Sequence, residues 1–316
     1  MEHRYSVGSE MRDGVEVVVL QEGPHARALV APSLGNNCFL FETKRPVLEP
    51  VVWSDFLKKP TSYGIPLLFP FPNRIRDGVF LFQGERFKVD PPRHGFVRDR
   101  PWNVVETGAS NLEGAWVRCA IHAADHPQIL NQFFPFTLEV TFRLRNRGLE
   151  IEAAAENCGE RNMPTGFGIH PYFRRPERGF VKVPAGKRWE LADSLPTGTL
   201  VDVAGAFDLR KPRDLAGLSL DDIYTDLAPD PSGRVQCFLT DEAEGTETVL
   251  DFDHRHFAHV GVYTPPAPRA AVCIEPNTCP TDAFNLQAQG IDASVIELKP
   301  GRKAEFHVRI LSRDLK

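Results

Sequence analysis

The chain has 316 residues, 42% hydrophobic and 25% charged, so it can bury a sizeable core and is not disordered as a whole. Its 42 acidic and 37 basic side chains give a net charge of -5 without a basic block, which argues against a nucleic-acid partner. Because there is neither a run of membrane-spanning length nor the apolar core of a signal peptide, we expect a cytoplasmic protein without a membrane partner.

Turn-forming and aromatic residues stand out in the composition. The chain has 27 prolines, 24 glycines and 22 phenylalanines against 3 methionines, which favours many turns around an aromatic core. Alternating apolar positions predict three hairpins in chain order: 79–82 with 86–89 around Gln83-Gly84, 138–144 with 149–155 around 146–148, and 295–298 with 306–310 around Pro300-Gly301. No segment carries a sustained apolar stripe of helical period. We therefore predict an all-β fold, a large antiparallel β-sandwich, with residues 1–316 in a single domain.

Metal and disulfide chemistry receive little support from the sequence. The six cysteines are scattered without a Cys-x-x-Cys pair, which predicts buried free thiols. A metal enzyme could be argued from His254, His256 and His259. On a strand, however, the first two would share a face and the third would point to the other face. None has an evident carboxylate to accept a hydrogen bond from its second ring nitrogen, as metal-binding histidines usually do. We expect these histidines to make local hydrogen bonds, and the cysteines and histidines together indicate no zinc cluster.

Two loop-like segments carry candidate binding residues. Three prolines stiffen the stretch before Arg74, so a rigid loop would present this guanidinium at a fixed place, although a single arginine beside a turn is more often a solvated surface group. His94 follows two prolines and precedes Gly95, which is typical of a loop. It could donate a hydrogen bond to a ligand or equally satisfy a backbone carbonyl. Trp102, a few residues later, is expected in the core.

Two further segments place a titratable side chain where an ordinary strand would not. Glycines before His170 let the backbone approach closely, and the proline after it fixes the exit of the chain. Histidine is the usual side chain for moving a proton near neutral pH, but a structural histidine explains this segment equally well. Glu275 ends an apolar strand, where partial burial would raise its pKa toward that of a useful base. The alternative is a structural carboxylate that caps the turn at Asn277-Thr278.

These segments occur together in a recognisable order and spacing. The matching stretches are Asn73-Arg74-Ile75, His94-Gly95, Gly168-Ile169-His170-Pro171-Tyr172-Phe173, Glu275-Pro276 and Ala283-Phe284-Asn285, with residues 206–212 and 220–224 between them. Together they resemble the aldose 1-epimerase (galactose mutarotase) family over nearly the whole chain. Each stretch is weak alone, but the joint arrangement is specific.

The resemblance implies a galactose mutarotase-like supersandwich with a sugar cleft on one sheet face and no metal or organic cofactor. It assigns Glu275 as the general base, His170 as the general acid, and Arg74, His94 and Asp221 as the residues that hold the sugar hydroxyls and ring oxygen. The assignment makes chemical sense, because anomer exchange removes the proton of the C1 hydroxyl while the ring oxygen O5 is protonated. The expected partner is a small-molecule sugar, bound by a monomer or homodimer.

The class of sugar is less defined. The run from His94 to Arg98 is more similar to the hexose-6-phosphate and sulfosugar branches than to galactose mutarotases, so Arg98 could meet an anion. The phosphate branch, however, typically carries an arginine just before Gly-Ile-Pro, where this chain has Tyr63. A neutral hexose is therefore expected first, with Arg98 pairing with Asp99 or another nearby acid, and a hexose 6-phosphate or sulfosugar is the alternative. A non-catalytic sugar-binding protein is disfavoured because the acid and base are both present.

Overall fold

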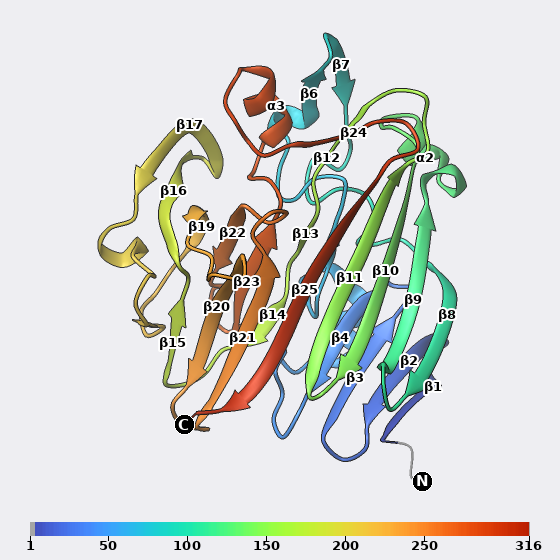
Figure 1. Ribbon diagram of the computed structural model, residues 1–316, viewed down its shortest axis with the longest axis vertical. Helices are drawn as coiled ribbons and strands as arrows, with labels where there is room; N and C mark the ends of the chain where they lie inside the picture. The colour runs from blue at the N-terminus through green and yellow to red at the C-terminus, as the bar shows by residue number, and fades with distance from the viewer. Residues whose placement is uncertain (1–3, 316) are drawn as a thin grey trace.

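The computed structural model describes residues 4–315, and its regular secondary structure is mainly antiparallel β-sheet (Figure 1). The nine-stranded sheet has the order β18 (Arg213–Asp214), β15 (Gly179–Lys182), β20 (Arg234–Asp241), β21 (Thr246–Asp253), β25 (Lys303–Asp314), β11 (Gly148–Asn157), β10 (Phe136–Arg145), β9 (Gly114–His122) and β8 (Asn103–Ser110). The eight-stranded sheet has the order β17 (Leu195–Asp202), β16 (Ala185–Ala192), β19 (Asp221–Leu227), β22 (His259–Tyr263), β23 (Ala271–Asn277), β13 (Gly168–Ile169) and β5 (Leu67–Leu68), with β14 (Tyr172–Arg174) also paired to β23.

Smaller elements complete the fold. A four-stranded sheet contains β1 (Tyr5–Arg12), β2 (Val15–Glu22), β3 (Ala26–Ala31) and β4 (Asn37–Glu42). Two further pairs are β6 (Val79–Phe82) with β7 (Glu85–Lys88), and β12 (Met163–Thr165) with β24 (Ile296–Leu298). The helices are short: α1 (Trp53–Lys58), α2 (Pro127–Leu130), α3 (Ala283–Ala288) and the 3-10 turns Pro60–Ser62, Arg76–Gly78, Ala123–Asp125 and Gly205–Phe207. The predicted all-β antiparallel architecture is confirmed.

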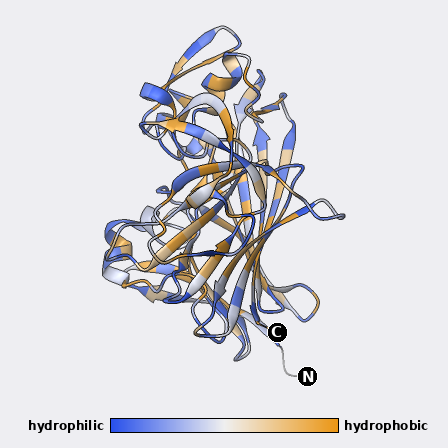
Figure 2. Cartoon of the chain, turned by 90° about the vertical axis from the view of Figure 1, so that its left-hand side faces the viewer, coloured by the Kyte–Doolittle hydropathy of each residue, from blue (hydrophilic) through white to orange (hydrophobic). Residues whose placement is uncertain are grey.

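The core lies between the nine-stranded sheet and the two sheets that cover it. In Figure 1 the eight-stranded sheet overlaps the half that contains β20 and β21, and the four-stranded sheet packs against β8, β9 and β10. Apolar and polar residues alternate along the strands, as the changing colours in Figure 2 show. Aromatic side chains link the layers, because Phe167 before β13 stacks on Phe306 of β25 with ring centroids 5.0 Å apart. Burial of these rings fixes the two large sheets against each other.

Two of the three predicted hairpins are confirmed. β10 and β11 pair from Phe136 with Asn157 to Arg145 with Gly148, so Gly148 belongs to the strand and not to the turn. The turn residues Asn146 and Arg147 have φ of 52° and 57°, the left-handed geometry that two-residue hairpins prefer. β6 and β7 form the second hairpin around residues 83–84.

The third hairpin prediction, between residues 295–298 and 306–310, is wrong. Both segments are strands, but β24 pairs with β12, whereas β25 pairs with β11 on one edge and β21 on the other. With both edges of β25 occupied, no edge remains for β24. The side-chain amide of Asn157 donates to the carbonyls of Arg161 and Leu298, which holds the neighbouring loops where the chain crosses between sheets.

Two smaller expectations also need correction. His254 and His256 lie in the turn after β21 and not on a strand. Of the three histidines, only His259 is on a strand, as the first residue of β22. Five of the six cysteines are buried free thiols as predicted, but Cys158 is exposed. Trp102 is buried, as expected. Within residues 4–315, no helix is long and apolar enough to cross a membrane.

Candidate active site

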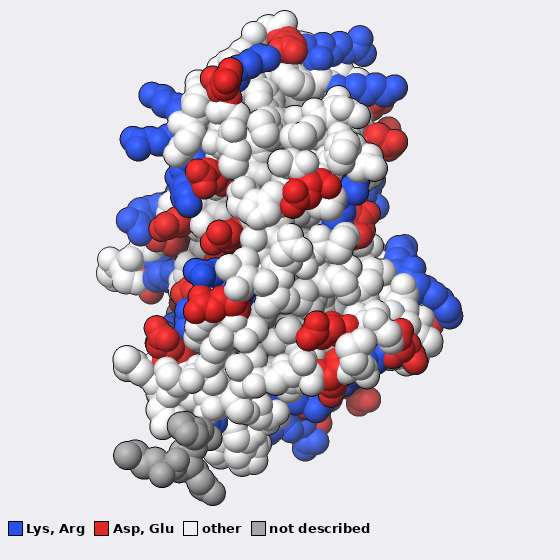
Figure 3. Space-filling model, turned by 90° about the vertical axis from the view of Figure 1, so that its right-hand side faces the viewer, with Lys and Arg blue, Asp and Glu red and all other residues white. Residues whose placement is uncertain are grey.

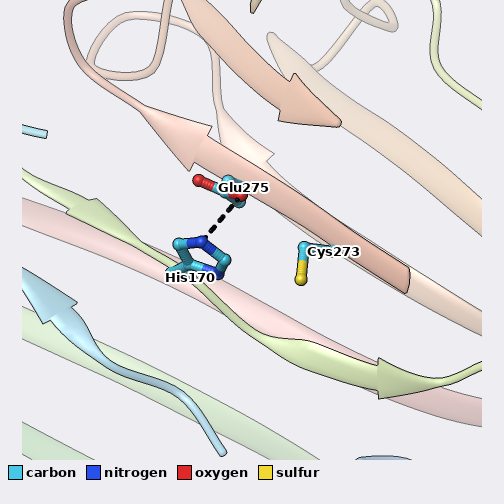
Figure 4. A group of neighbouring side chains, drawn as sticks. All are labelled: His170, Cys273 and Glu275. Atoms are coloured by element: carbon cyan, nitrogen blue, oxygen red, sulfur yellow. Dashed lines mark ion pairs between the residues drawn. The ribbon is translucent and has the colours of Figure 1, made fainter. Parts of the chain in front are cut away.

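A buried imidazole–carboxylate pair lies at the centre of the eight-stranded sheet. Glu275 is on β23, and His170 follows β13, which pairs with β23. The His170 Nε2 and Glu275 Oε1 atoms are 3.2 Å apart, and each residue is 6% exposed. Figure 4 shows the two side chains pointing toward one another from neighbouring segments. β23 continues through Asn277, so Glu275 lies inside the strand and not at its end.

Small residues allow this close approach. A Cβ atom on Gly168 would lie 1.9 Å from the Asn277 Oδ1 atom, so only glycine lets β13 lie this close to β23. Gly261 is directly opposite Glu275 on β22, and a Cβ there would lie 3.2 Å from the carboxyl group. The close backbone approach predicted around His170 is therefore present. The carboxyl group of Glu275 occupies space that a side chain at position 261 would otherwise fill.

Burial moves the two pKa values in opposite directions. It raises the pKa of Glu275 to about 8, the charge of Asp221 adds to this rise, and Arg93 opposes it. Burial lowers the pKa of His170 to about 3, and the charges of Arg98 and Arg93 lower this pKa further. Near pH 7 the pair therefore holds one proton, which resides on the carboxyl group. The 3.2 Å contact lets that proton pass to the imidazole.

His94 stands next to this pair. Its ring is nearly perpendicular to that of His170, with the centroids 5.5 Å apart. The predicted loop conformation is present, with φ of 62° at His94 and 69° at Gly95. A Cβ atom on Gly95 would lie 1.9 Å from the Phe69 carbonyl oxygen, so this step requires glycine. The Asn73 amide donates to His94 Nδ1 at 3.2 Å, and burial keeps the pKa of His94 well below its usual value.

The other predicted binding residues lie around the pair. Arg74 is directly opposite Arg93 in an isolated antiparallel bridge, and burial lowers its pKa while the charge of Asp221 raises it. Asp221 begins β19 and is exposed, opposite Tyr263. Arg98 is partly buried, and its charge acts on both histidines. Within residues 4–315, no carboxylate lies within ion-pair distance of Arg98; burial lowers the pKa of Arg98, and the charge of Asp99 opposes this effect.

Three residues near the pair were missed by sequence reasoning. Tyr172 stacks on His170 with centroids 4.7 Å apart and an interplanar angle of 17°. Tyr263 meets the same ring edge-on at 6.3 Å. Arg93 contacts His94. Tyr172 lies within a recognised segment and Arg93 directly before one, so both could have been weighed, whereas only the pairing of β22 with β23 brings Tyr263 here.

Two groups of side chains offer metal-binding donors. His170, Cys273 and Glu275 place one donor atom each within 4.8 Å of one another, and a second such group comprises Glu150, Glu152 and His307 on the nine-stranded sheet. Imidazole, thiolate and carboxylate are donors that Zn²⁺ accepts. Neither group contains the three histidines weighed from the sequence. His259 instead accepts from the Trp189 indole at 3.4 Å.

A groove of about 480 Å³ lies on the far side of the molecule, on the outer face of the nine-stranded sheet. Several of its charged side chains neutralise one another or their neighbours, as Arg143 does with Glu152 and Arg255 does with Asp253. Because a perturbed and unneutralised titratable pair is the stronger sign of chemistry, the His170–Glu275 pair marks the candidate active site.

Comparison with known proteins identifies the family and the fold. The aldose 1-epimerase family profile matches residues 39–311. The uncharacterized protein YihR of Escherichia coli K12 is 25% identical over 257 residues, 77% of each chain. The structure of a galactose mutarotase-like protein from Clostridium acetobutylicum superposes with a TM-score of 0.88 at 20% identity, covering 99% of both chains. That of galactose 1-epimerase from Lactobacillus acidophilus gives 0.80 at 15% identity, covering 100% of both. The chain therefore belongs to the aldose 1-epimerase family.

Proposed function

We propose that this protein is an isomerase that interconverts the α and β anomers of an aldose, with Glu275 and His170 moving the protons. The observation that carries the proposal is the buried pair itself, an imidazole and a carboxyl group 3.2 Å apart that hold one proton between them near pH 7. Membership of the aldose 1-epimerase family supports it. So does the fold shared with a galactose 1-epimerase.

The reaction needs one proton on the His170–Glu275 pair. Transfer from the Glu275 carboxyl group to His170 Nε2 gives a carboxylate base beside an imidazolium acid. The carboxylate then takes the proton of the C1 hydroxyl while the imidazolium protonates O5, and the ring opens to the free aldehyde. After rotation about the C1–C2 bond, O5 attacks the other face of the carbonyl and both proton transfers reverse. The pair returns to its starting state, so no redox or group-transfer step is required.

The surrounding groups suit a polyhydroxylated ring. Arg74 and His94 present donors and Asp221 presents an acceptor, and we assign them to the sugar hydroxyls and ring oxygen. Both ring nitrogens of His94 face protein donors, the Asn73 amide at Nδ1 and Arg93 Nε at Nε2, so His94 reaches a sugar oxygen only when the exposed Arg93 side chain turns away. Tyr263 adds an apolar ring face against which C–H groups of a sugar can pack.

The test is anomer exchange measured by NMR on glucose, galactose, glucose 6-phosphate and a sulfosugar. We expect Glu275→Gln and His170→Asn each to lower kcat about 10²- to 10⁴-fold, the usual contribution of a positioned proton-transfer group. His25→Asn and Glu16→Gln, at exposed positions in the four-stranded sheet region, are the matched controls. Full activity in Glu275→Gln would refute the base assignment. Binding of sugars without any acceleration by the unmodified chain would indicate a sugar-binding protein instead.

A further inference from the structure

The imidazole of His170 lacks a hydrogen-bond anchor on one side. Its Nε2 atom faces Glu275, but within residues 4–315 its buried Nδ1 atom makes no hydrogen bond with another residue. Catalytic histidines are usually oriented by a partner at the second ring nitrogen. Because rotation of the ring about its Cβ–Cγ bond is only weakly restricted, another contact must hold the plane of this imidazole.

Stacking on Tyr172 sets that plane. The two ring centroids are 4.7 Å apart, and the ring planes differ by 17°. His94 and Tyr263 meet the imidazole edge-on, at 5.5 Å and 6.3 Å, so neither ring lies flat against it. A parallel stack restricts the rotation of both rings, so the imidazole is only as well placed as the Tyr172 ring.

Tyr172 is held by three other segments of the chain. Its amide donates to the Gly64 carbonyl at 2.8 Å, and its carbonyl accepts from the Glu49 amide at 2.9 Å. Arg269 lies in the loop between β22 and β23, and its guanidinium Cζ atom is 5.1 Å from the centroid of the Tyr172 ring. The same Cζ atom is 4.5 Å from the Tyr63 centroid. The backbone bonds thus place the strand, and the guanidinium contacts the ring.

Arg269 is itself fixed in place. Its Nε atom donates to Glu49 Oε1 at 2.9 Å, and a terminal nitrogen donates to Glu49 and, at 2.9 Å, to the Ser62 carbonyl. Glu49 is only 8% exposed. Figure 3, by contrast, shows basic and acidic side chains intermixed at the surface of one face, where ion pairs are solvated. Stability alone does not explain a partly buried pair, because the cost of removing its charges from water offsets much of their attraction.

We propose that Arg269 is a positioning residue of the active site: bound to Glu49, it holds the Tyr172 ring against the His170 imidazole. This rests on the proposed epimerase function, in which the imidazole must meet Glu275 and the ring oxygen of the sugar in one orientation. Rotation of the imidazole would lengthen its 3.2 Å contact with Glu275. A misplacement of about 1 Å can lower a rate about 100-fold.

The experiment measures kcat and KM of Arg269→Lys for anomer exchange, with whichever of the four sugars named above the unmodified chain converts fastest. Lysine keeps the positive charge but lacks the planar fork that binds a carboxylate and lies against aromatic rings. We expect kcat to fall about tenfold or more and KM to change less than about twofold, because the groups assigned to the sugar are unchanged.

Arg188→Lys is the matched control. Arg188 is on the same sheet, pairs with Asp222 at 3.2 Å, and has its Cζ atom 3.9 Å from the Phe207 centroid. This variant removes the same kind of clamp away from His170 and should leave kcat unchanged. Urea unfolding of both lysine variants checks that they are folded under the assay conditions.

Two comparisons test whether Arg269 acts through Tyr172 and His170. Tyr172→Phe keeps a ring to stack and should retain at least about ten times the kcat of Tyr172→Leu. In a His170→Asn background, Arg269→Lys should cause no further loss of kcat, because the effects of residues that act as one unit are not additive. If Arg269→Lys does not fold, Glu49→Gln replaces it in both tests, since glutamine keeps the shape of Glu49 but not its charge.

Unchanged kcat in the Arg269 or Glu49 variant, or a loss that persists in full in the His170→Asn background, would overturn the positioning role and leave the epimerase function intact. A rise in KM with unchanged kcat would overturn it as well, because it would assign Arg269 to sugar binding. Acceleration of no sugar by the unmodified chain would overturn the epimerase function itself.

Discussion

The pH dependence of the reaction tests the electrostatics of the catalytic pair through a residue outside it. After burial, the charge of Asp221 is the main cause of the raised pKa of Glu275, about 8. Above that pH the pair loses the single proton that the mechanism uses, so kcat/KM should fall tenfold per pH unit. Asp221→Asn removes the neighbouring charge and lowers the pKa of Glu275. The fall of kcat/KM on the alkaline side of the pH profile, called the alkaline limb below, should therefore begin at lower pH.

The size of the shift follows from Coulomb's law. Asp221 is exposed, so its effect on Glu275 is screened by water, and a nearby charge of this kind contributes about 1 kcal/mol. Since one pKa unit is about 1.4 kcal/mol, the limb should move down by about 0.7 unit. At high salt the difference between the two proteins should shrink.

The assay is anomer exchange by NMR from pH 5 to 10, with the uncatalysed rate subtracted. The readout is the pH at which kcat/KM begins to fall. The size of kcat/KM is not used, because Asp221 is also assigned to substrate binding. Asp226→Asn, at an exposed position on the same strand, makes the same charge change and should leave the limb in place. An unchanged or raised limb in Asp221→Asn would contradict the assignment of Glu275 as the group that titrates there.

Two further variants test the packing and hydrogen bonding that hold the fold. Gly95→Ala places a Cβ atom 1.9 Å from the Phe69 carbonyl oxygen and should lower the free energy of unfolding, measured in urea, by more than about 3 kcal/mol. The control Gly84→Ala has a similar positive φ but open space around it, and should lower this free energy by about 1 to 2 kcal/mol. Equal urea midpoints for the two variants would mean that the Phe69 backbone moves aside without cost. Asn157→Ala removes a buried amide that bonds the Leu298 carbonyl and two other backbone groups, and should lower the free energy of unfolding by about 2 to 3 kcal/mol in the same assay; a loss below about 0.5 kcal/mol would show that water replaces these bonds.

Local pattern predicted the parts of the fold that depend on neighbours in sequence. The alternation from Leu138 to Ala155 specifies a hairpin whose turn and register lie within one short segment, and the structure has it. The segments at 295–298 and 306–310 also read correctly as strands, but their partners lie more than 50 residues away in the sequence. Which edge a strand joins depends on packing between sheets, and spacing along the chain carries no information about that.

The candidate site shows the same division. His170 and Glu275 stood out as residue types in unusual local settings, yet each had an equally good structural explanation until β13 and β23 were seen to place them 3.2 Å apart. The absence of an ion pair at Arg98 within residues 4–315 could not be predicted, because it depends on every element that surrounds this side chain.

The position of β25 constrains how the protein folds. This strand lies between β11 and β21 and is the only link in the nine-stranded sheet between the strands β8–β11 and the strands β15, β18, β20 and β21. During synthesis, each half of the sheet therefore exposes an unpaired edge until residues 303–314 emerge. Such edges can pair with other chains, so newly made protein is most exposed to aggregation before β25 inserts, and folding is slowed by the long loops that its insertion closes.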